Sequence, residues 1–243
     1  GAMSQPRPEA LRPLPAAGPS ATRRIANGSL VVVCHLAAVA VLLPLTLIVW
    51  HLLARGLAGL DLGFFIHMPK PVGEAGGGMA NAIVGTLMVV AIGALFAIPV
   101  GVGTGVYLAE FGTGRFASVV RYVSDVLGGV PSIVVGVAAY GLIVAPMGRF
   151  SGIAGGVALG ILMLPTIIRS TEEVVRLVPQ SYRHAALALG APGWKVALQV
   201  VIPAASAGIV TALLLAIARA AGETAPLLLT ALGNRFWSVA VDQ

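Results

Sequence analysis

Long apolar stretches alternate with short polar segments along the whole chain after the first 25 residues. About 20 consecutive apolar residues are needed for a helix to cross the hydrocarbon core of a membrane. On this basis we predict five spans, at 30–53, 81–109, 128–144, 153–168 and 203–232. Strands of a membrane barrel would instead alternate apolar and polar residues over short segments. The pattern therefore predicts an all-α, polytopic helical membrane protein.

The polar segments define two parts of the chain. Residues 1–25 are rich in proline and polar residues and are predicted to form a disordered cytoplasmic tail. Its first three residues, Gly1-Ala2-Met3, resemble the scar left by protease cleavage of a tag. Residues 26–243 are predicted to form one transmembrane domain, which includes a long cytoplasmic loop at 172–202.

The composition excludes several classes of protein. Hydrophobic residues make up 58% of the chain and charged residues only 10%, with a mean hydropathy of +0.96. A soluble domain of this size could not bury so much apolar surface. The net charge of +6 does not indicate nucleic-acid binding, because the basic residues form no stripe with interleaved aromatics. Cys34 is the single cysteine, so neither an internal disulfide nor a metal site built on thiols is predicted.

The basic residues predict the orientation of the spans. With the N-terminus inside, the cytoplasmic segments contain ten basic residues: Arg7, Arg12, Arg23, Arg24, Arg115, Arg121, Arg169, Arg176, Arg183 and Lys195. The outer segments contain four: Arg55, Lys70, Arg149 and Arg235. Because Lys and Arg are enriched in cytoplasmic loops, this distribution favours a cytoplasmic N-terminus. Five spans then place the C-terminus outside.

Glycines recur at a spacing of four residues in two predicted spans. They are Gly101 and Gly105, and then Gly152, Gly156 and Gly160. This spacing lets helix backbones approach closely. The run at 101–105 is not a nucleotide-binding loop, because it lies inside a span, and the phosphate-loop pattern G-x-x-x-x-G-K-[ST] is absent from the sequence. The chain is therefore not expected to hydrolyse ATP itself.

The predicted cytoplasmic loop contains a short amphipathic helix. Pro179 is suited to its first position and Gly190 to its end. Its apolar face combines Tyr182, Ala185, Ala186 and Leu189. A second helix is predicted from Trp194 into the membrane at Pro203. Physical reasoning leaves two alternatives for the apolar face: docking on a partner, or lying on the protein's own bundle or on lipid headgroups.

The same loop resembles the signature loop of the permeases of ABC importers. That signature reads Glu-Ala-Ala, three residues, Gly, nine residues and then Ile-x-Leu-Pro. The matching residues here are His184-Ala185-Ala186, Gly190 and Val200-Val-Ile202-Pro203, so that His184 replaces the usual Glu. The resemblance implies that this loop forms a coupling helix, which docks in a groove of a separate ATPase subunit. We call residues 172–202 the coupling loop.

Three further stretches resemble the phosphate-specific branch of this family, in particular its A-type permeases. They are Asp125-Val-Leu-Gly-Gly-Val-Pro131-Ser132-Ile-Val-Val-Gly136, Leu164-Pro165-Thr166-Ile-Ile-Arg169-Ser170-Thr171-Glu172-Glu173, and Ala218-Arg219-Ala-Ala-Gly222-Glu223-Thr224-Ala225-Pro226-Leu227. The resemblance covers about 81–237. It implies the type I importer fold, which normally has six spans, so that the sixth is missing from this sequence.

The resemblance also implies the setting in which the chain acts. It implies a bacterial inner membrane, inorganic phosphate as the substrate, and no cofactor in this chain. The implied partners are a homologous second permease, two copies of an ATPase that binds ATP and Mg, and an extracytoplasmic phosphate-binding protein.

The candidate substrate pathway centres on Arg219 and Glu223. They are four residues apart, and a continuous helix would place them on one face. Each charge inside a membrane costs about 2.5–3.5 kcal/mol on insertion scales, so such residues usually face a cavity or a partner. Arg219 could donate hydrogen bonds to a passing phosphate, with Glu223 weakening its hold. Alternatively, the two residues form a structural ion pair. Gly222 and Pro226 are expected to loosen the helix around them.

Two other residues complete the predicted pathway. Arg169 follows the fourth span, where it either guides phosphate at the inner mouth or extends to the membrane surface as an ordinary basic residue. Ser132 lies beside the Gly-Gly-Val-Pro segment with Asp125, where we expect a helix cap or a kink. Glu172 and Glu173 are expected to be solvated.

Other functions remain open at this point. Sulfate could be bound by the same donors as phosphate. A secondary anion transporter would need a coupling site for an ion or proton, and one Arg–Glu pair is thin support for it. A membrane enzyme would need clustered catalytic groups, and the sequence has no such constellation of His, Cys and Asp.

Overall fold

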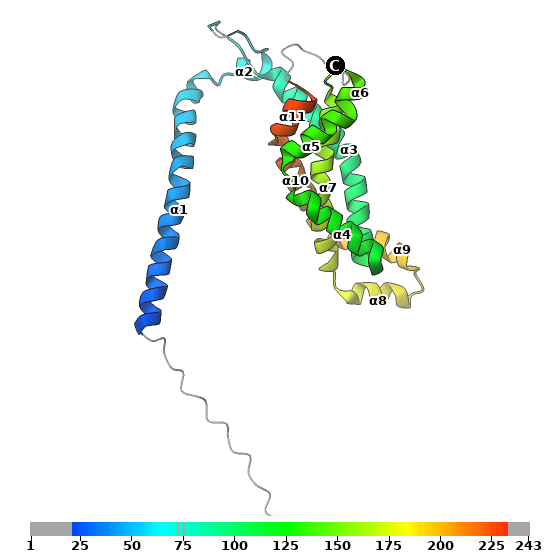
Figure 1. The fold of residues 1–243 in the computed structure, drawn as a ribbon. Coiled ribbons are helices and arrows are strands. Elements are labelled where there is room, and N and C mark those ends of the chain that lie inside the picture. The colour runs from blue at the N-terminus through cyan, green and yellow to red at the C-terminus, as the bar shows by residue number, and fades with distance from the viewer. Residues whose placement is uncertain (1–20, 72, 75, 233–243) are drawn as a thin grey trace, which may run out of the picture. The chain divides into compact units, whose positions relative to one another are not determined.

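The structure, a computed structural model, describes residues 21–71, 73–74 and 76–232 (Figure 1). These residues form helices and connecting segments, without a strand. Four of the helices are long and apolar enough to cross a membrane, and a bent pair of helices makes a fifth span if it is counted as one. The all-α fold is therefore confirmed for the described residues, with four or five spans.

The first of two compact units contains the N-terminal helix. Helix α1, Ala21–Gly56, is followed by the 3-10 turn Leu57–Gly59. It begins before the predicted start at residue 30 and within the segment predicted as a tail, whose residues 1–20 lie outside the described residues. The apolar residues of α1 are exposed along its whole length, as expected of a surface that faces lipid.

The second unit, from Leu62 onward, contains the remaining helices. They are α2 (Leu62–Ile66), α3 (Ala80–Glu110), α4 (Gly114–Gly129), α5 (Ser132–Ala139), the π-helical turn Tyr140–Val144, α6 (Ala145–Met147), α7 (Gly152–Arg176), α8 (Gln180–Ala188), α9 (Gly193–Val196), the π-helical turn Ala197–Val201, α10 (Ile202–Ala221) and α11 (Ala225–Thr230). Helices α8 and α9 lie at one end of this unit, and α6 and α11 lie at the other (Figure 1).

The predicted close packing between glycine-bearing helices is found between α3 and α7. A Cβ atom built on Gly101 would lie 2.6 Å from Cγ2 of Ile167, and one on Gly105 would lie 2.6 Å from Cβ of Thr171. From the other side, a Cβ on Gly156 would lie 2.5 Å from Cγ2 of Ile92. Real Cβ atoms do not come so close to other atoms, so the two helices pack at this distance only because glycines face the contact.

The third predicted span is one limb of a bent pair of helices. Helices α4 and α5 meet at an angle of 102°, and the break falls at Val130 and Pro131. Pro131 precedes Ser132, and the residue before a proline is pushed out of the helical region of backbone space. The kink expected at the Gly-Gly-Val-Pro segment is therefore confirmed. Asp125 does not cap α5, because it lies within α4.

The bounds of the last predicted span, 203–232, are wrong at both ends. A continuous helical segment begins at Gly193, runs through the π-helical turn and ends at Ala221. Gly222, Glu223 and Thr224 then separate α10 from the short helix α11. The apolar composition is the same on both sides of this break, so hydropathy alone does not reveal it. The fourth predicted span, 153–168, extends further, to Arg176.

The glycine contact between α3 and α7 can be tested with two alanine substitutions on one helix. We expect Gly105→Ala to destabilise the protein by about 1–3 kcal/mol, as overpacking does, because the new methyl group would meet Thr171 and the carbonyl oxygen of Ile168. Gly103→Ala is the matched control, because nothing lies within 4 Å of its Cβ position. Unfolding of the purified protein in detergent measures both. Equal stability of the two variants would contradict the packing described here.

Candidate functional site

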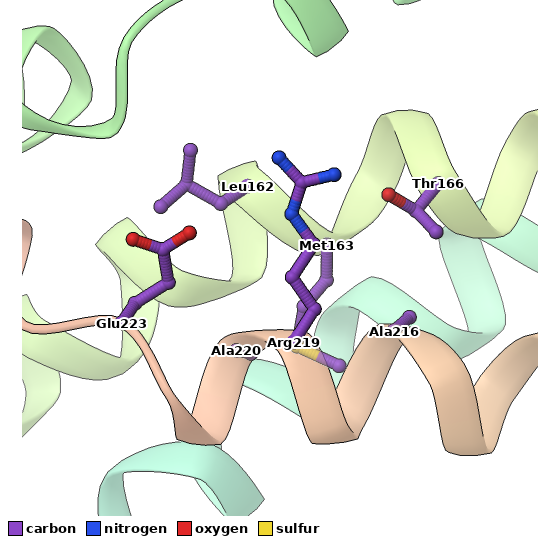
Figure 2. Close-up of a pocket in the computed structure, with 7 residues that line it drawn as sticks. All are labelled: Leu162, Met163, Thr166, Ala216, Arg219, Ala220 and Glu223. Atoms are coloured by element: carbon purple, nitrogen blue, oxygen red, sulfur yellow. The ribbon is translucent and has the colours of Figure 1, made fainter. Parts of the chain in front are cut away.

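A hollow between α7 and α10 contains the two intramembrane charges. It is lined by residues of α7, of α10 and of the break that follows α10: Leu162, Met163, Thr166, Ala216, Arg219, Ala220 and Glu223 (Figure 2). Figure 2 shows the side chains of Arg219 and Glu223 extending in the same direction from this part of the backbone. The hollow has a volume of about 10 Å³, which is room for about one water molecule. It is too small for a tetrahedral oxyanion in this conformation.

The sequence predicts that Arg219 and Glu223 share one face of a continuous helix. This prediction is wrong. Arg219 lies in the last turn of α10, and Glu223 lies in the break beyond Gly222. Pro226 is in the first turn of α11, where its missing N–H and fixed backbone angle favour a helix start. Gly222 and Pro226 are expected to loosen the helix locally. In the structure the helix is interrupted completely between Ala221 and Ala225.

No ion pair joins Arg219 to Glu223 among the interactions of the described residues. The alternative of a structural ion pair is therefore not realised in this conformation. Arg219 is exposed and Glu223 is half-buried, and Thr166 brings a hydroxyl group to the same hollow. The arrangement offers guanidinium donors, one hydroxyl and a nearby carboxylate, which is suited to holding an anion weakly.

The position of Glu223 depends on α11, which packs away from α10. A Cβ atom on Gly136 of α5 would lie 2.7 Å from Cα of Pro226, so α5 and α11 are in close contact. The N–H of Ser151 donates to the carbonyl oxygen of Thr230 at 3.1 Å. Glu223 therefore lies between two elements: its N–H donates to the carbonyl oxygen of Ala220 in α10 at 3.2 Å, and the chain after it enters α11, which packs on α5.

The other two predicted pathway residues lie outside this hollow. Ser132 is the half-buried first residue of α5. Nε of Arg169 pairs with Oδ1 of Asp125 at 3.1 Å, and its Nη1 lies 3.7 Å from Oε2 of Glu172. Arg169 is thus engaged by two carboxylates, which compete with any anion for its guanidinium group. Its role at the inner mouth stays a prediction.

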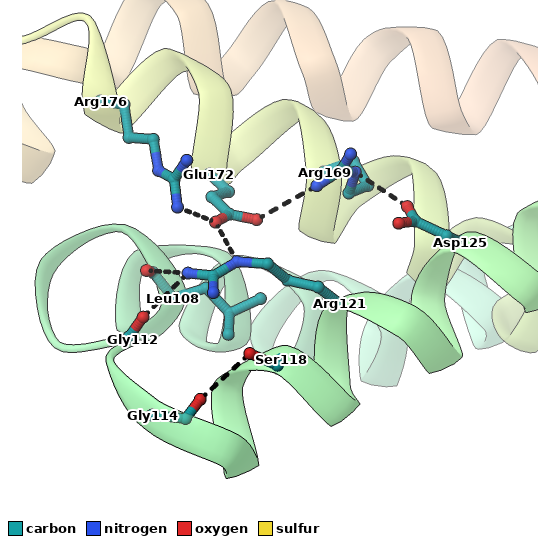
Figure 3. A network of polar contacts seen from close by, with 9 residues as sticks. All are labelled: Leu108, Gly112, Gly114, Ser118, Arg121, Asp125, Arg169, Glu172 and Arg176. Atoms are coloured by element: carbon teal, nitrogen blue, oxygen red, sulfur yellow. Dashed lines mark hydrogen bonds and ion pairs between the residues drawn. The ribbon is translucent and has the colours of Figure 1, made fainter.

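The expectation that Glu172 is solvated is wrong. Glu172 is buried and lies at the centre of a charge network (Figure 3). Its side chain is only 2% exposed. Nε of Arg121 donates to Oε1 of Glu172 at 2.7 Å, and Nη2 of Arg176 donates to the same oxygen at 2.5 Å. Arg121 also donates to the carbonyl oxygens of Leu108 and Gly112. A buried carboxylate needs such partners, because leaving it unpaired would carry a large desolvation penalty.

Part of this network could have been found from the sequence. Glu172 is three residues after Arg169 and four before Arg176, which are spacings that bring side chains together on a helix. Arg121 is 51 residues away from Glu172, and no local pattern points to that contact. Glu173 is exposed, as predicted.

The coupling loop contains the predicted helix. Helix α8 has Pro179 as its N-cap, one position before the predicted one, and Gly190 follows it with a φ of 82°. Within the predicted apolar face, Tyr182 is 55% exposed and Leu189 is 90% exposed, while Ala185 is exposed as well. Ala186 is half-buried against the apolar cluster around Val175 and Val201. Apart from Ala186, the face is thus not covered by any of the described residues.

The remaining predicted residues of the coupling loop are placed as follows. His184 is exposed and makes no side-chain hydrogen bond or ion pair with any described residue. Pro203 lies in the first turn of α10, where a proline is tolerated. Glu172–Arg176, predicted as the start of this loop, is the end of α7.

Sequence reasoning missed one contact of the coupling loop. Arg183 was counted only as a cytoplasmic basic residue, but it is buried and forms an ion pair with Glu110, at the end of α3, at 2.6 Å. The signal for this contact is weak, since the two residues are 73 positions apart. No group of three or more His, Cys, Asp or Glu among the described residues could hold a metal ion.

Residues 101–241 match the family described as binding-protein-dependent transport system inner membrane component. The chain is 46% identical over 192 residues to the phosphate transport system permease protein PstA of Yersinia pestis, a match that covers 79% of this chain and 65% of the relative. It is 44% identical over 223 residues to PstA of Xylella fastidiosa, covering 91% of this chain and 77% of the relative. It is 41% identical over 232 residues to PstA 1 of Mycobacterium tuberculosis strain H37Rv, covering 93% and 74%.

A solved structure has a similar fold. The MetNI methionine ABC transporter in an inward-facing conformation matches with a TM-score of 0.56 and 21% sequence identity. The match covers 64% of this chain and 76% of the transporter chain. At this level of identity the likeness concerns the fold.

The buried network can be tested by removing its central carboxylate. We expect Glu172→Ala to destabilise the protein by about 3 kcal/mol, near the lower end for a broken buried ion pair, because the arginines around it reach solvent. Glu173→Ala is the matched control on the adjacent exposed position, where a change within about 0.5 kcal/mol is expected. Denaturant unfolding in detergent measures both. If Glu172→Ala is as stable as Glu173→Ala, the network does not support the fold.

Proposed function

Because the chain belongs to the family of binding-protein-dependent transport system inner membrane components, we propose that it is the permease subunit of an ATP-driven phosphate importer. The observation that carries the proposal is the exposed Arg219 in a membrane-spanning segment, beside a hollow and without an ion-pair partner among the described residues. An unpaired charge at such a position is costly and usually serves a passing ligand. The similarity to phosphate permeases of three organisms supports phosphate as that ligand.

The proposal includes partners that this chain needs for transport. Phosphate is delivered by an extracytoplasmic binding protein and crosses between this chain and a homologous second permease. ATP and Mg bind to two ATPase subunits, so this chain is not itself the enzyme. The distribution of basic residues supports an inner-membrane location with the N-terminus in the cytoplasm.

Arg219 is proposed to hold the phosphate, and Glu223 to weaken that hold. A guanidinium group donates two parallel hydrogen bonds to a phosphate, and the hydroxyl group of Thr166 at the same hollow can add another. The carboxylate of Glu223 repels the anion and competes for the arginine. Since Glu223 lies in the connection between α10 and α11, a movement of α11 against α10 would change this competition and release the phosphate.

The exposed face of α8 is proposed to dock on an ATPase subunit, so that closure of the two ATPase subunits moves α8. Tyr182, His184, Ala185 and Leu189 are all exposed on this short helix at one end of the second unit. An apolar surface of this kind, presented on a helix, is suited to docking in a groove. The coupling helix implied by the sequence resemblance has the same position in the chain.

The role of Arg219 can be tested by phosphate uptake. Proteoliposomes that contain this subunit with its second permease, ATPase and binding protein are expected to take up radiolabelled phosphate when ATP is present. We expect Arg219→Ala to lower uptake by about ten- to a hundredfold. This range corresponds to the loss of about 1.5–3 kcal/mol from hydrogen bonds to a charged group. Arg219→Lys should retain part of the activity, because it keeps the charge without the planar fork.

Several outcomes of this experiment would contradict the proposal. Uptake by Arg219→Ala at the parent rate would show that Arg219 is outside the pathway. Uptake of sulfate in place of phosphate by the parent would change the substrate, and uptake without ATP would indicate a secondary transporter. Assembly and ATP hydrolysis are measured in every variant as controls.

Docking through α8 can be tested with two exposed leucines. We expect Leu189→Ser to weaken binding of the ATPase subunit by about tenfold, since burying a leucine contributes about 1.5–3 kcal/mol. Leu177→Ser is the matched control, because Leu177 is 80% exposed near the same end of the unit but lies before α8. Titration of the detergent-solubilised protein with the ATPase subunit measures the affinity. Equal affinity of the two variants would place the docking surface elsewhere.

A further inference from the structure

Arg183 differs from the other residues of the helix that carries it. In α8, every residue of which is described, Arg183 alone is buried. Its side chain is 11% exposed, and that of its partner Glu110 is 10% exposed. Burying an arginine is unfavourable unless its donors are satisfied, so this position requires a specific set of acceptors.

All three nitrogens of the guanidinium group have acceptors. Nε lies 3.0 and 3.1 Å from the two carboxylate oxygens of Glu110, and Nη2 donates to Oε1 of the same residue at 2.6 Å. Nη2 also donates to the carbonyl oxygen of Val175 at 2.9 Å, and Nη1 donates to that of Val178. One side chain of α8 therefore binds two other segments of the protein at once.

These acceptors lie at the ends of the two central helices. Glu110 is the last residue of α3, and Val175 and Val178 lie in and just after the last turn of α7. The last carbonyls of a helix lack partners within it, and its C-terminal end carries a partial negative charge. A carboxylate at the end of α3 adds to this charge, so both helix ends attract the same cation. Arg183 supplies that cation.

The other contacts of α8 with the bundle are apolar. Ala186 packs against the cluster around Val175 and Val201, with no polar group that fixes its direction. Contacts of this kind are non-directional and allow neighbouring surfaces to slide. The planar fork of an arginine is directional, because its donors have a fixed geometry. Among the described residues, Arg183 is thus the polar side-chain link between α8 and the helices α3 and α7.

We infer that Arg183 is a positioning residue that transmits movement of the coupling helix to α3 and α7. This inference rests on the proposed function. Helix α7 contributes Leu162, Met163 and Thr166 to the hollow around Arg219, and its glycine contacts join it closely to α3. A displacement of α8 by the ATPase subunits is carried through Arg183 and Glu110 to the pair of helices that borders the phosphate pathway.

The experiment measures coupling in the complete complex with its second permease, ATPase and binding protein. The readout is phosphate transported per ATP hydrolysed, at equal amounts of assembled complex. We expect Arg183→Ala and Glu110→Gln each to lower this ratio at least fivefold while ATP hydrolysis continues. The double variant is expected to be no worse than Arg183→Ala alone, because both changes remove the same link. Arg115→Ala is the control, since Arg115 is an exposed arginine at the start of α4, with no ion pair to a described residue.

Glu110→Gln keeps the shape of the side chain and its oxygen acceptor, so it tests the inference even if Arg183→Ala does not assemble. Arg183→Lys is expected to restore assembly and only part of the ratio, because one ammonium group cannot reach all the acceptors. A parental ratio in assembled Glu110→Gln and Arg183→Lys complexes would overturn the inference and leave Arg183 a purely structural residue. If the parent complex itself moves no phosphate, the proposed function fails, and this inference fails with it.

Discussion

The close approach of α3 and α7 is the contact on which the second unit is built. Glycines of each helix face side chains of the other, so that Ile92, Ile167 and Thr171 lie directly against the opposite backbone. Inside a membrane the burial of apolar surface gives little preference for protein over lipid, so van der Waals contact at short range must hold such helices together. Helix α7 also contacts α4, α5, α10 and α11. The position of each of these helices therefore depends on its contact with the α3–α7 pair.

Two kinds of charged site lie around this pair of helices: one is buried and paired, and the other lies beside a hollow without an ion pair. At the ends of α3 and α7, Glu172 and Arg183 are buried and have several partners each. Beside Leu162, Met163 and Thr166 of α7, Arg219 of α10 and Glu223 of the following break face a hollow and are not paired with each other in the described structure. Charges that are paired in this way fix the position of the helices that they join, whereas charges without a partner stay available for a ligand. The paired and the unpaired charges thus both border α7 without competing for the same side chains.

Much of the fold could be predicted from local sequence patterns. Hydropathy predicted the spans approximately, the glycine spacing predicted close packing of the helices that carry it, and Pro179 with Gly190 predicted the short helix α8. The interruption after Ala221 was missed as a helix end, because apolar residues continue through it and only Gly222 and Pro226 mark it. The partners of Glu172 and Arg183 were missed because Arg121 and Glu110 are far away in sequence. Basic residues near membrane edges also indicate orientation, so their positions in the sequence do not reveal the contacts that they make.

The π-helical turn Ala197–Val201 sets the rotational phase of α10 relative to the coupling helix. A π turn accommodates one residue more than an α turn, and each residue of an α-helix advances the chain by about 100° around its axis. Without that extra residue, every side chain after Val201 would be turned by about this angle. Arg219 would then leave the side of α10 that faces α7. The location of the charge beside the hollow is thus determined some 20 residues earlier, by the number of residues in a single turn.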